Sequence, residues 1–329
     1  MQSTNKSLKS EFIFDSEATA NALPYRELTR SIENLLSDNN VSVPQRIVLP
    51  MAKDSSLFVM PAHDSNIAIT KIISVLPYNR DLGLPSVQGD ILVFDIHTGR
   101  RIALLDGPTV TARRTAAVSL LAAQRLAPTN RGPMLIVGAG DQGKAHLEAF
   151  QEVIGVEKVF IYSRTKASAD TLVLYANKLG IEAQQIDDPN QALAYCPLVI
   201  SATPALEVVL TKMPREGTFI SAVGAYKPNM AEWSAPVCQE LAKKGTLVVD
   251  TRDADHEAGD FLQAGIHVPT IPCLSDVVCN TATWLHREKR ETTSSVFFKN
   301  CGWAGWDLAA ARCIAKAIKQ LMATSSYKL

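Results

Sequence analysis

The chain has 329 residues, which is long for one domain and sufficient for two. Its 33 basic and 33 acidic side chains give a formal net charge of zero, which argues against nucleic-acid binding and against a polybasic membrane anchor. Hydrophobic residues make up 47% of the chain and charged residues 20%, as in folded globular proteins and unlike disordered ones.

Targeting signals and metal-ligand patterns are not evident in the sequence. No apolar run reaches the roughly 18 residues that a membrane-spanning helix needs, and the polar N-terminus has no apolar segment behind it. The 6 cysteines form no C-x-x-C pair, and the 6 histidines show no zinc-type spacing. We therefore expect a cytoplasmic protein with reduced cysteines and no metal site.

The N-terminal part shows the pattern of an α+β domain. Apolar residues at helical spacing predict a helix over 18–36, with Leu28, Ile32 and Leu35 on its apolar face. Short β-forming runs follow, and the prolines and glycines between them predict a meandering sheet. The predicted strands of this sheet cover 46–49, 57–60, 67–74, 89–95 and 101–105. An alanine-rich helix is predicted over 111–126, and the prolines and glycine after it mark a boundary between domains.

From residue 134 the sequence alternates between strands and helices. The predicted helices cover 142–154 and 168–179, and a last, amphipathic helix is predicted over 303–322. The predicted strands cover 134–137, 158–162, 198–201, 218–223 and 246–250. Because strands that alternate with helices are typical of α/β proteins, we expect a parallel sheet covered on both faces. We expect the last helix to pack back on the first domain.

The strongest motif is the G-A-G-D-Q-G turn at 138–143. It follows an apolar strand and opens a helix, which is the context that a dinucleotide-binding turn requires. The first glycine permits the tight turn, the second lets the backbone approach a pyrophosphate, and the third allows close packing of helix on sheet. The N-terminus of the helix stabilises the negative charge. We therefore assign dinucleotide binding to Gly138, Gly140, Asp141, Gln142 and Gly143.

The end of the next predicted strand bears on the choice of dinucleotide. An NAD site usually has an acidic residue about 20 residues after the glycines, which binds the 2′-hydroxyl of the ribose. Here the chain reads Ser163, Arg164 and Thr165, without an acid. A hydroxyl followed by a guanidinium suits a 2′-phosphate, because arginine can bind its oxygens in bidentate fashion. We therefore predict that NADPH is preferred over NADH, with NADH still possible.

Three cationic side chains lie in apolar or β-rich surroundings. Arg46 follows a proline and a glutamine, Lys71 lies in the middle of a predicted strand, and Arg114 lies near the start of the alanine-rich helix. A lysine in a strand is costly if it is buried without a partner. Each residue taken singly is compatible with an ordinary surface charge, so only their combination indicates a site.

Taken together, the motifs resemble those of the ornithine cyclodeaminase/mu-crystallin superfamily over nearly the whole chain. The ordered set is far more specific than any one of its pieces. The matching stretches are P-Q-R at 44–46, T-K at 70–71, G-L-P-S at 83–86, L-D-G at 105–107, T-A-R-R-T-A-A at 111–117, V-G-A-G-D-Q at 137–142, A-V-G-A at 222–225, G-D at 259–260, and F-K-N-C-G at 298–302 with Asp307.

The resemblance implies a homodimer in which a Rossmann-type α/β domain is inserted in an α+β domain. Residues 1–118 and 303–329 would form the substrate-binding and dimerisation domain, and residues 119–302 the NAD(P)-binding domain. Arg46, Lys71 and Arg114 would converge on the substrate carboxylate. The resemblance also places residues beside the cofactor or the reacting carbon: Ser86, Thr111, Arg114, Thr203, Val223 and Gly224, with Asn300 and Cys301 on the substrate side.

The segment after the predicted strand 218–223 separates the activities of this superfamily. Cyclodeaminases carry an aspartate in a G-D-C-P-G-K-like segment, whereas this chain reads G-A-Y-K-P-N-M, with Tyr226 in place of the acid and Met230 in place of the later lysine. A phenol does not serve as a carboxylate base near neutral pH without a large pKa shift, so cyclisation of ornithine is disfavoured. The segment is similar to that of ketimine reductases, whose substrates include Δ1-pyrroline-2-carboxylate and Δ1-piperideine-2-carboxylate.

The resemblance therefore implies hydride transfer from NADPH to C2 of a cyclic imino acid, giving L-proline or L-pipecolate. Arg46 and Arg114 would hold the carboxylate, and Lys71 would complete the anion site. Because two arginines would flank it, the pKa of Lys71 should fall, which would make it a proton donor to the imine nitrogen. Solvent is the alternative donor.

Three other readings stay open. An amino-acid dehydrogenase that makes alanine from pyruvate and ammonia would use the same cationic pocket. An ornithine cyclodeaminase would need another acid near Tyr226, and Asp307 and Glu232 are the candidates. A non-catalytic binding protein of the mu-crystallin type would have no need of the complete set of three cations.

Overall fold

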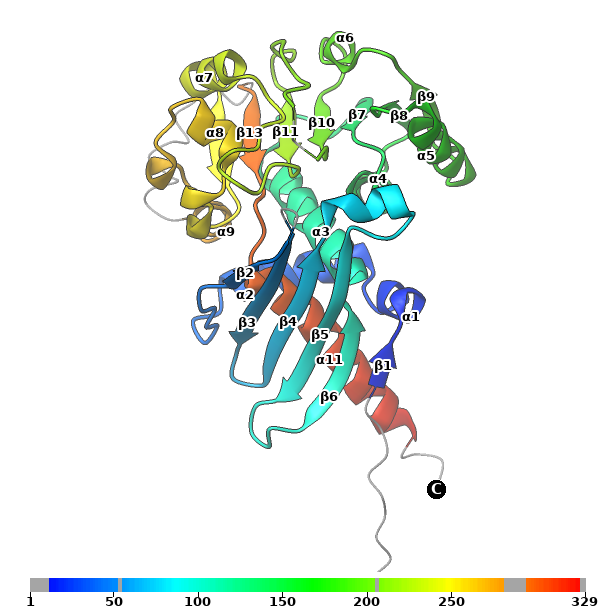
Figure 1. Cartoon of the computed structure of the whole chain (residues 1–329), viewed down its shortest axis with the longest axis vertical. Coiled ribbons are helices and arrows are strands. Elements are labelled where there is room, and N and C mark those ends of the chain that lie inside the picture. Colours follow the sequence, from blue (N-terminus) through cyan, green and yellow to red (C-terminus); the bar gives the residue numbers. More distant parts are fainter. Residues whose placement is uncertain (1–11, 53–54, 205–206, 281–293, 326–329) are drawn as a thin grey trace, which may run out of the picture. The chain divides into compact units, whose positions relative to one another are not determined.

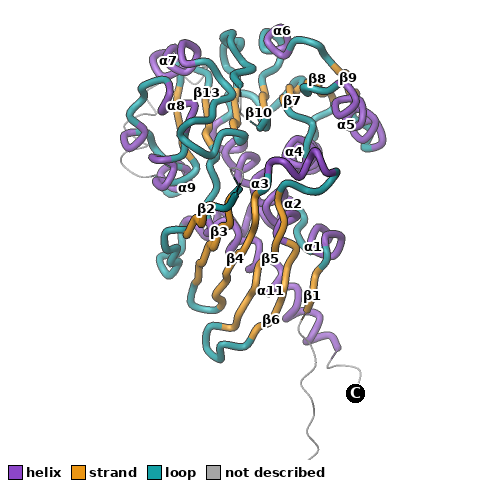
Figure 2. The backbone as a smooth tube through the Cα atoms, viewed as in Figure 1, coloured by secondary structure: helices purple, strands orange, loops and turns teal. Residues whose placement is uncertain are grey.

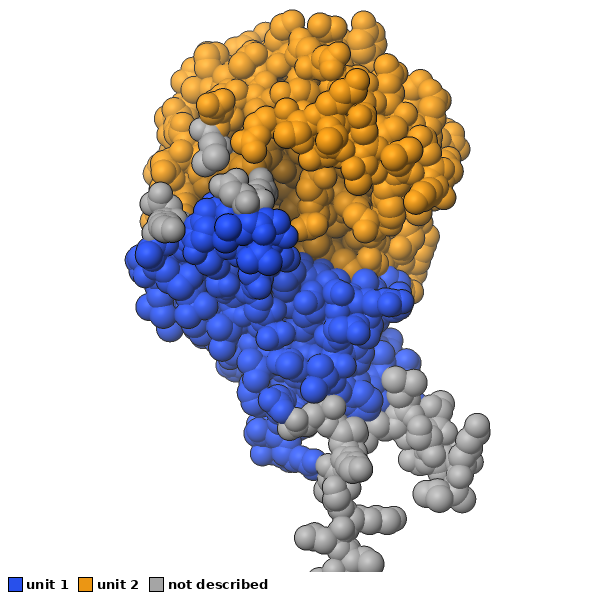
Figure 3. All heavy atoms as spheres, turned by 45° about the vertical axis from the view of Figure 1, so that its right-hand side comes forward, with its two compact units in different colours: residues 1–24, 38–111, 307–329 blue, residues 25–37, 112–306 orange. Residues whose placement is uncertain are grey.

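The computed structural model describes residues 12–52, 55–204, 207–280 and 294–325. The chain divides into two compact units (Figure 3). Unit 1 is drawn from residues 1–24, 38–111 and 307–329, and unit 2 from residues 25–37 and 112–306. Two long helices, α3 (Gly107–Leu126) and α11 (Ala304–Ser325), contribute residues to both units.

Unit 1 contains a six-stranded sheet in the order β1-β6-β5-β4-β3-β2 within the described residues. From β2 to β6 the strands form an antiparallel meander, and β1 pairs with β6 in parallel (Figure 2). The expected meander is thus confirmed. The strands are β1 (Phe12–Phe14), β2 (Ile47–Pro50), β3 (Ser56–His63), β4 (Ile67–Val75), β5 (Val87–Asp95) and β6 (Arg101–Asp106), and the 3₁₀ helix η1 (Pro77–Leu82) precedes β5.

Side chains of β4 alternate between a buried face and a more open face, as expected of a half-buried strand. Ile69, Lys71 and Ile73 are buried, and α11 runs along this face of the sheet (Figure 1). The buried side of the helix includes Leu308 and Ile314. The expectation that the last helix packs back on the N-terminal domain is therefore confirmed.

The predicted helix over 18–36 is wrong, because two helices occupy this stretch. They are α1 (Ser16–Asn21) and α2 (Tyr25–Leu36), and Pro24 lies between them. A proline has no backbone N–H to continue a helix, and it restricts the residue before it to extended conformations. The apolar spacing continued through the break, so periodicity alone did not reveal it. The two helices belong to different units.

Unit 2 contains a seven-stranded parallel sheet in the order β12-β13-β11-β10-β7-β8-β9 within the described residues. The predicted α/β fold is confirmed. The strands are β7 (Met134–Val137), β8 (Lys158–Tyr162), β9 (Glu182–Gln185), β10 (Leu198–Ser201), β11 (Phe219–Ala222), β12 (Thr246–Val249) and β13 (Val296–Lys299). The helices after β7 are α4 (Asp141–Ile154), α5 (Lys166–Lys178), α6 (Pro189–Ala192), α7 (Ala235–Lys244), α8 (Gly259–Gln263) and α9 (Leu274–Val278), with the 3₁₀ helices η2 (Arg252–His256) and η3 (Val268–Thr270).

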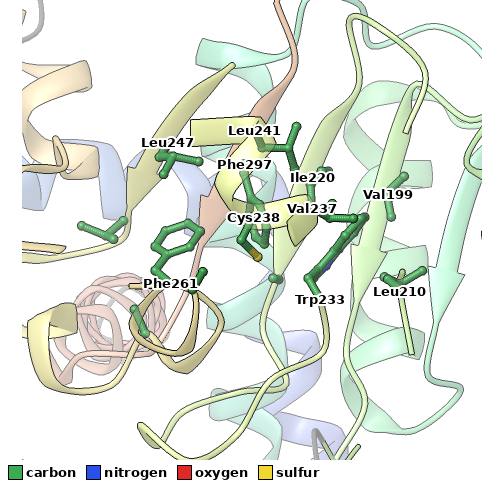
Figure 4. Close-up of a cluster of buried hydrophobic side chains, with 14 of the residues drawn as sticks. Val199, Leu210, Ile220, Trp233, Val237, Cys238, Leu241, Leu247, Phe261 and Phe297 are labelled. Carbon is green, nitrogen blue, oxygen red and sulfur yellow. The ribbon is translucent and has the colours of Figure 1, made fainter. Parts of the chain in front are cut away.

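An aromatic cluster packs α7 and α8 on the parallel sheet (Figure 4). The ring of Phe297, in β13, lies 5.5 Å from that of Trp233 and 4.9 Å from that of Phe261, measured between ring centres. Such tilted and edge-on contacts stabilise a core beyond the area they bury. The cluster fixes the segment that follows β11. No helix among the described residues is long and apolar enough to cross a membrane.

Candidate active site

The glycine-rich turn after β7 leaves space in which a dinucleotide pyrophosphate fits. Gly138 has a φ of +114°, and a Cβ atom there would lie 2.4 Å from the carbonyl oxygen of Ala202. A Cβ on Gly143 would lie 2.0 Å from the carbonyl oxygen of Gly138, so both positions require glycine. A Cβ on Gly140 would meet no described atom within 4 Å, which leaves the N-terminus of α4 open to an anion.

The other residues predicted to bind the dinucleotide lie at the same edge of the parallel sheet. Asp141 and Gln142 begin α4, and Oε1 of Gln142 is buried without a hydrogen-bond partner among the described residues. Ser163, Arg164 and Thr165 directly follow β8, and the Arg164 side chain is exposed. Since β7 lies between β8 and β10, the chain reverses its direction across the sheet here, and open α/β sheets bind ligands at such a point. These residues fit a dinucleotide.

Thr203 and Gly224 meet beyond the carboxyl ends of β10 and β11. Both donate backbone N–H groups to the carboxylate of Glu232, which is fully buried. Val223 joins Gly224 to β11, and its backbone N–H donates to the carbonyl oxygen of Ser201. Both oxygens of Glu232 are therefore engaged by hydrogen bonds within the protein.

Arg114 lies on α3 in unit 2 and is only 5% exposed. A Cβ on Gly302 would lie 3.1 Å from Nη1 of Arg114, so the backbone after β13 passes directly beside the guanidinium. Asp250 supports this backbone, because its Oδ2 accepts hydrogen bonds from the Gly302 N–H at 2.8 Å and from Nε1 of Trp306 at 3.3 Å. Burial raises the pKa of Asp250, and these hydrogen bonds and the charge of Arg114 oppose the rise.

Asn300 follows β13 and is held by buried hydrogen bonds. Its Nδ2 donates to the carbonyl oxygen of Thr115 at 3.2 Å and to Oγ of Ser119 at 3.3 Å. Oγ of Ser119 also lies 2.9 Å from Nε2 of His146, and burial lowers the pKa of His146 to about 4, so this imidazole is neutral at pH 7. Oδ1 of Asn300 is buried without a partner among the described residues and can accept from a bound donor. Burial also raises the pKa of Cys301, which keeps its thiol protonated.

Lys71 lies on the buried face of the unit 1 sheet and is 0% exposed. Its Nζ is 3.1 Å from Oδ1 and 3.3 Å from Oδ2 of Asp307, which is also fully buried. A lysine at this depth requires such a counter-ion. The expectation of a lower pKa for Lys71 considered only the positive charges of two arginines. It did not include the negative charge of Asp307. Asp307 is therefore the counter-ion of Lys71 within unit 1.

The remaining predicted residues of unit 1 lie at strand and helix ends. Arg46 directly precedes β2, and its guanidinium carbon is 5.6 Å from the centre of the Phe58 ring. Ser86 directly precedes β5, and its Oγ is buried without a hydrogen-bond partner among the described residues. Thr111 lies early in α3, where its Oγ1 donates to the carbonyl oxygen of Gly107 at 2.7 Å.

The predicted site residues are divided between the two units. Unit 1 holds Arg46, Lys71, Ser86 and Thr111, and unit 2 holds Arg114 and the other predicted residues. The dinucleotide turn and the ends of β8, β10 and β11 are brought to one edge within unit 2. The convergence of Arg46 and Lys71 with Arg114 on one carboxylate stays a prediction. No sequence pattern indicated that Asp307 pairs with Lys71, or that Glu232 accepts hydrogen bonds from Thr203 and Gly224.

A model of the ornithine cyclodeaminase/mu-crystallin family matches residues 16–321 of the chain. Among curated proteins, Delta(1)-pyrroline-2-carboxylate reductase 1 of Burkholderia multivorans is 31% identical over 93% of this chain and 96% of its own length. The ketimine reductase mu-crystallin of Mus musculus is 32% identical over 84% of this chain and 85% of its own.

Solved structures are similar over the same span. The Delta(1)-pyrroline-2-carboxylate reductase of Thermococcus litoralis, solved with NADH and L-proline, superposes with a TM-score of 0.84 at 28% identity, covering 94% of this chain and 98% of its own. An archaeal alanine dehydrogenase dimer with bound NAD superposes with a TM-score of 0.81 at 25% identity, covering 94% and 97%. The likeness therefore extends over both units of the chain.

Proposed function

Because the chain belongs to the ornithine cyclodeaminase/mu-crystallin family, we propose that it reduces cyclic 2-imino acids with a nicotinamide dinucleotide. The substrates are Δ1-pyrroline-2-carboxylate and Δ1-piperideine-2-carboxylate, and the products are L-proline and L-pipecolate. The observation that carries this proposal is the segment after β11, where Tyr226 takes the place of the cyclodeaminase aspartate. The two acids that could replace it, Glu232 and Asp307, are both engaged within the protein.

The residues of the chain have separate tasks in this reaction. When bound, the reduced cofactor supplies the hydride that adds to C2 of the substrate. Arg46 and Arg114 bind the substrate carboxylate and thereby fix the orientation of C2. Lys71 donates a proton to the imine nitrogen, and Asp307 holds the ammonium in place for this transfer. The C=N bond thus gains one hydride and one proton and becomes a CH–NH bond.

A substrate panel with the purified protein tests this function. We expect oxidation of NADPH with the five- and six-membered cyclic imino acids. Faster oxidation with pyruvate and ammonia would instead identify an alanine dehydrogenase, for which the archaeal relative provides the precedent. Release of ammonia from ornithine would identify a cyclodeaminase. Cofactor binding without turnover of any of these compounds would identify a binding protein.

The proposed cofactor preference is for NADPH, because the turn after β8 offers Ser163 and Arg164 and no acid. Arg164→Ala is expected to raise the Kd for NADPH by about tenfold or more, since it removes a hydrogen bond to a charged group. The Kd for NADH should change less than about twofold, because its 2′-hydroxyl carries no charge for arginine to bind. Fluorescence titration with each cofactor measures both values.

Lys178→Ala is the matched control for this experiment. Lys178 lies at the other end of α5, so its removal should leave both Kd values unchanged. Equal losses for the two cofactors in Arg164→Ala would contradict recognition of the 2′-phosphate.

We assign substrate binding and dimerisation to residues 1–118 and 303–329, and cofactor binding to residues 119–302. The open face of the unit 1 sheet supports a homodimer. Cross-strand pairing aligns apolar side chains on this face, including Ile47 opposite Val59 and Val59 opposite Ile72. Ile47 is 53% exposed and Ile72 39%, although both are large and apolar. A second copy of the chain would cover this face symmetrically.

Ile72→Glu is expected to convert the dimer to a monomer, because a charge at the centre of the apolar face would be desolvated in the interface. Sedimentation velocity at a fixed protein concentration measures the change. Leu174→Glu, which alters a 64% exposed leucine on α5, is the control and should leave the dimer intact. A dimer that persists in Ile72→Glu would place the interface elsewhere.

A further inference from the structure

Glu232 joins the ends of two neighbouring parallel strands. Its Oε1 accepts hydrogen bonds from the backbone N–H of Thr203 at 2.7 Å and from the Thr203 hydroxyl at 3.0 Å. Its Oε2 accepts from the backbone N–H of Gly224 at 2.8 Å and from the hydroxyl of Ser201 at 3.0 Å. Ser201 is the last residue of β10, Thr203 follows this strand, and Gly224 follows β11. A single carboxylate therefore holds the two segments together.

The two segments are too close for any side chain between them. A Cβ on Gly224 would lie 2.2 Å from the carbonyl oxygen of Thr203 and 2.5 Å from Oε1 of Glu232. Such contacts are far inside the normal packing distance, so this position accepts only glycine. The ladder between β10 and β11 ends with the hydrogen bond from the Val223 N–H to the carbonyl oxygen of Ser201 at 2.8 Å. Beyond that bond, the carboxylate of Glu232 links the backbone N–H groups of Thr203 and Gly224.

The backbone of Glu232 is held by a second buried carboxylate, that of Asp260. Oδ1 of Asp260 accepts the backbone N–H groups of Glu232 at 2.7 Å and of Trp233 at 3.0 Å. Lys299, at the end of β13, places its Nζ 3.0 Å from Oδ2 of Asp260. Glu232, Asp260 and Lys299 are all fully buried. Burial raises the pKa of Glu232, and the charge of Lys299 and the two backbone N–H groups oppose the rise.

The cluster of Glu232, Asp260 and Lys299 contributes little net stability to the core, because burial of charged groups carries a desolvation penalty. Replacement of buried ion pairs by well-packed apolar residues is often neutral or stabilising in proteins. The cluster lies at the carboxyl edge of the sheet, beside the strand reversal where the dinucleotide turn is found. Its position therefore points to a task at the ligand-binding edge rather than to stability alone.

We propose that Glu232 is a positioning residue that sets the spacing of Thr203 and Gly224, the residues that would hold the nicotinamide half of the cofactor. This inference rests on the proposed function. The adenosine half uses different residues, at 138–143 and 163–165. Glu232 therefore determines affinity for the nicotinamide half without affecting affinity for the adenosine half.

Glu232→Gln tests the proposal without a change of volume. A glutamine has one acceptor oxygen, so its NH₂ group must face the backbone N–H of either Thr203 or Gly224, and one of the two segments loses its partner. We expect the Kd for NADPH to rise by about tenfold, as for the loss of a hydrogen bond to a charged group. The Kd for 2′,5′-ADP, which lacks the nicotinamide half, should change less than about twofold.

Calorimetric titration of the full-length protein with each ligand provides both values, and neither requires turnover. Glu240→Gln, on the exposed side of α7, is the matched control and should change neither Kd. If the variant binds NADPH and 2′,5′-ADP with equal losses, or with no loss, the positioning role is excluded. If the unmodified protein binds neither NADPH nor NADH, the proposed function fails instead.

Thr203→Val provides a second variant should Glu232→Gln not fold. It removes only the hydroxyl donor to Oε1 and keeps the shape of the side chain and the backbone N–H. We expect the same selective loss of NADPH affinity, of about threefold, because one neutral donor is removed. An unchanged ratio of the two Kd values in this variant would also overturn the proposal.

Discussion

Arg114→Ala is expected to raise the KM for the cyclic imino acid by about 30-fold or more, as for the loss of about 2 kcal/mol or more when one partner of a buried charge pair is truncated. Arg114 is 5% exposed, so its charge is poorly screened by water and acts strongly on a bound carboxylate. The effect on kcat should be smaller, because carboxylate binding is common to the ground state and the transition state. Steady-state kinetics with the cyclic imino acid separate the two parameters.

Arg113→Ala is the control for this variant. Arg113 is the adjacent residue, but its guanidinium carbon lies 3.9 Å from the centre of the Tyr25 ring and its Nη1 is 3.3 Å from Oε2 of Glu148. These contacts engage it away from the proposed substrate site, so its removal should leave KM unchanged. Arg114→Lys should recover part of the affinity, because it keeps the charge and loses the bidentate geometry. An unchanged KM in Arg114→Ala would remove this residue from the substrate site.

Lys71→Met is expected to lower kcat by about a hundredfold to ten-thousandfold, which is the usual contribution of a positioned general acid. The same change should lower the free energy of unfolding by about 3 to 5 kcal/mol, because it leaves the buried carboxylate of Asp307 without a partner. A loss of activity in this variant alone would therefore not distinguish catalysis from structure.

The double variant Lys71→Met, Asp307→Asn separates the two effects. The second change removes the stranded charge, so most of the lost unfolding free energy should return. The value of kcat should stay low, because no ammonium is restored. Urea unfolding measures the first quantity and steady-state kinetics the second. Recovery of kcat together with stability would reduce Lys71 to a structural residue, and a change in KM alone would make it an anion-binding group.

The central strands of the parallel sheet could be predicted almost residue by residue. The runs 134–137 and 198–201 agree with the observed strands, because strands buried on both faces are continuous apolar segments bounded by turns. The run 158–162 also agrees, although its residues alternate between buried and half-buried. β9 could not be predicted in this way, since it reads E-A-Q-Q and lies at the edge of the sheet. β13 is a short apolar run that ends in Lys299, and the ammonium group of this buried lysine pairs with Asp260.

Those parts of the candidate site that lie within a local sequence motif could be predicted. The turn at 138–143 could be predicted because its three glycines form a local motif, in which Gly138 and Gly143 have no space for a side chain and Gly140 leaves the N-terminus of α4 open. The burial of Lys71 raises the question of a partner, but Asp307 lies 236 positions further along the chain, and no periodicity links the two. Glu232 shows the same limit, because its hydrogen-bond donors come from two different strand ends. Pairings of this kind follow from topology and not from spacing.

The assembly of unit 1 from distant segments has a consequence for biosynthesis. The strand that carries Lys71 leaves the ribosome long before α11, which supplies Asp307. During that interval the antiparallel strands lack both the helix that covers their apolar side and the counter-charge for a lysine destined for the interior. The N-terminal region therefore cannot reach its final state until α11 has been synthesised, and the apolar face of its sheet stays uncovered while β7 to β12 of the parallel sheet are being made.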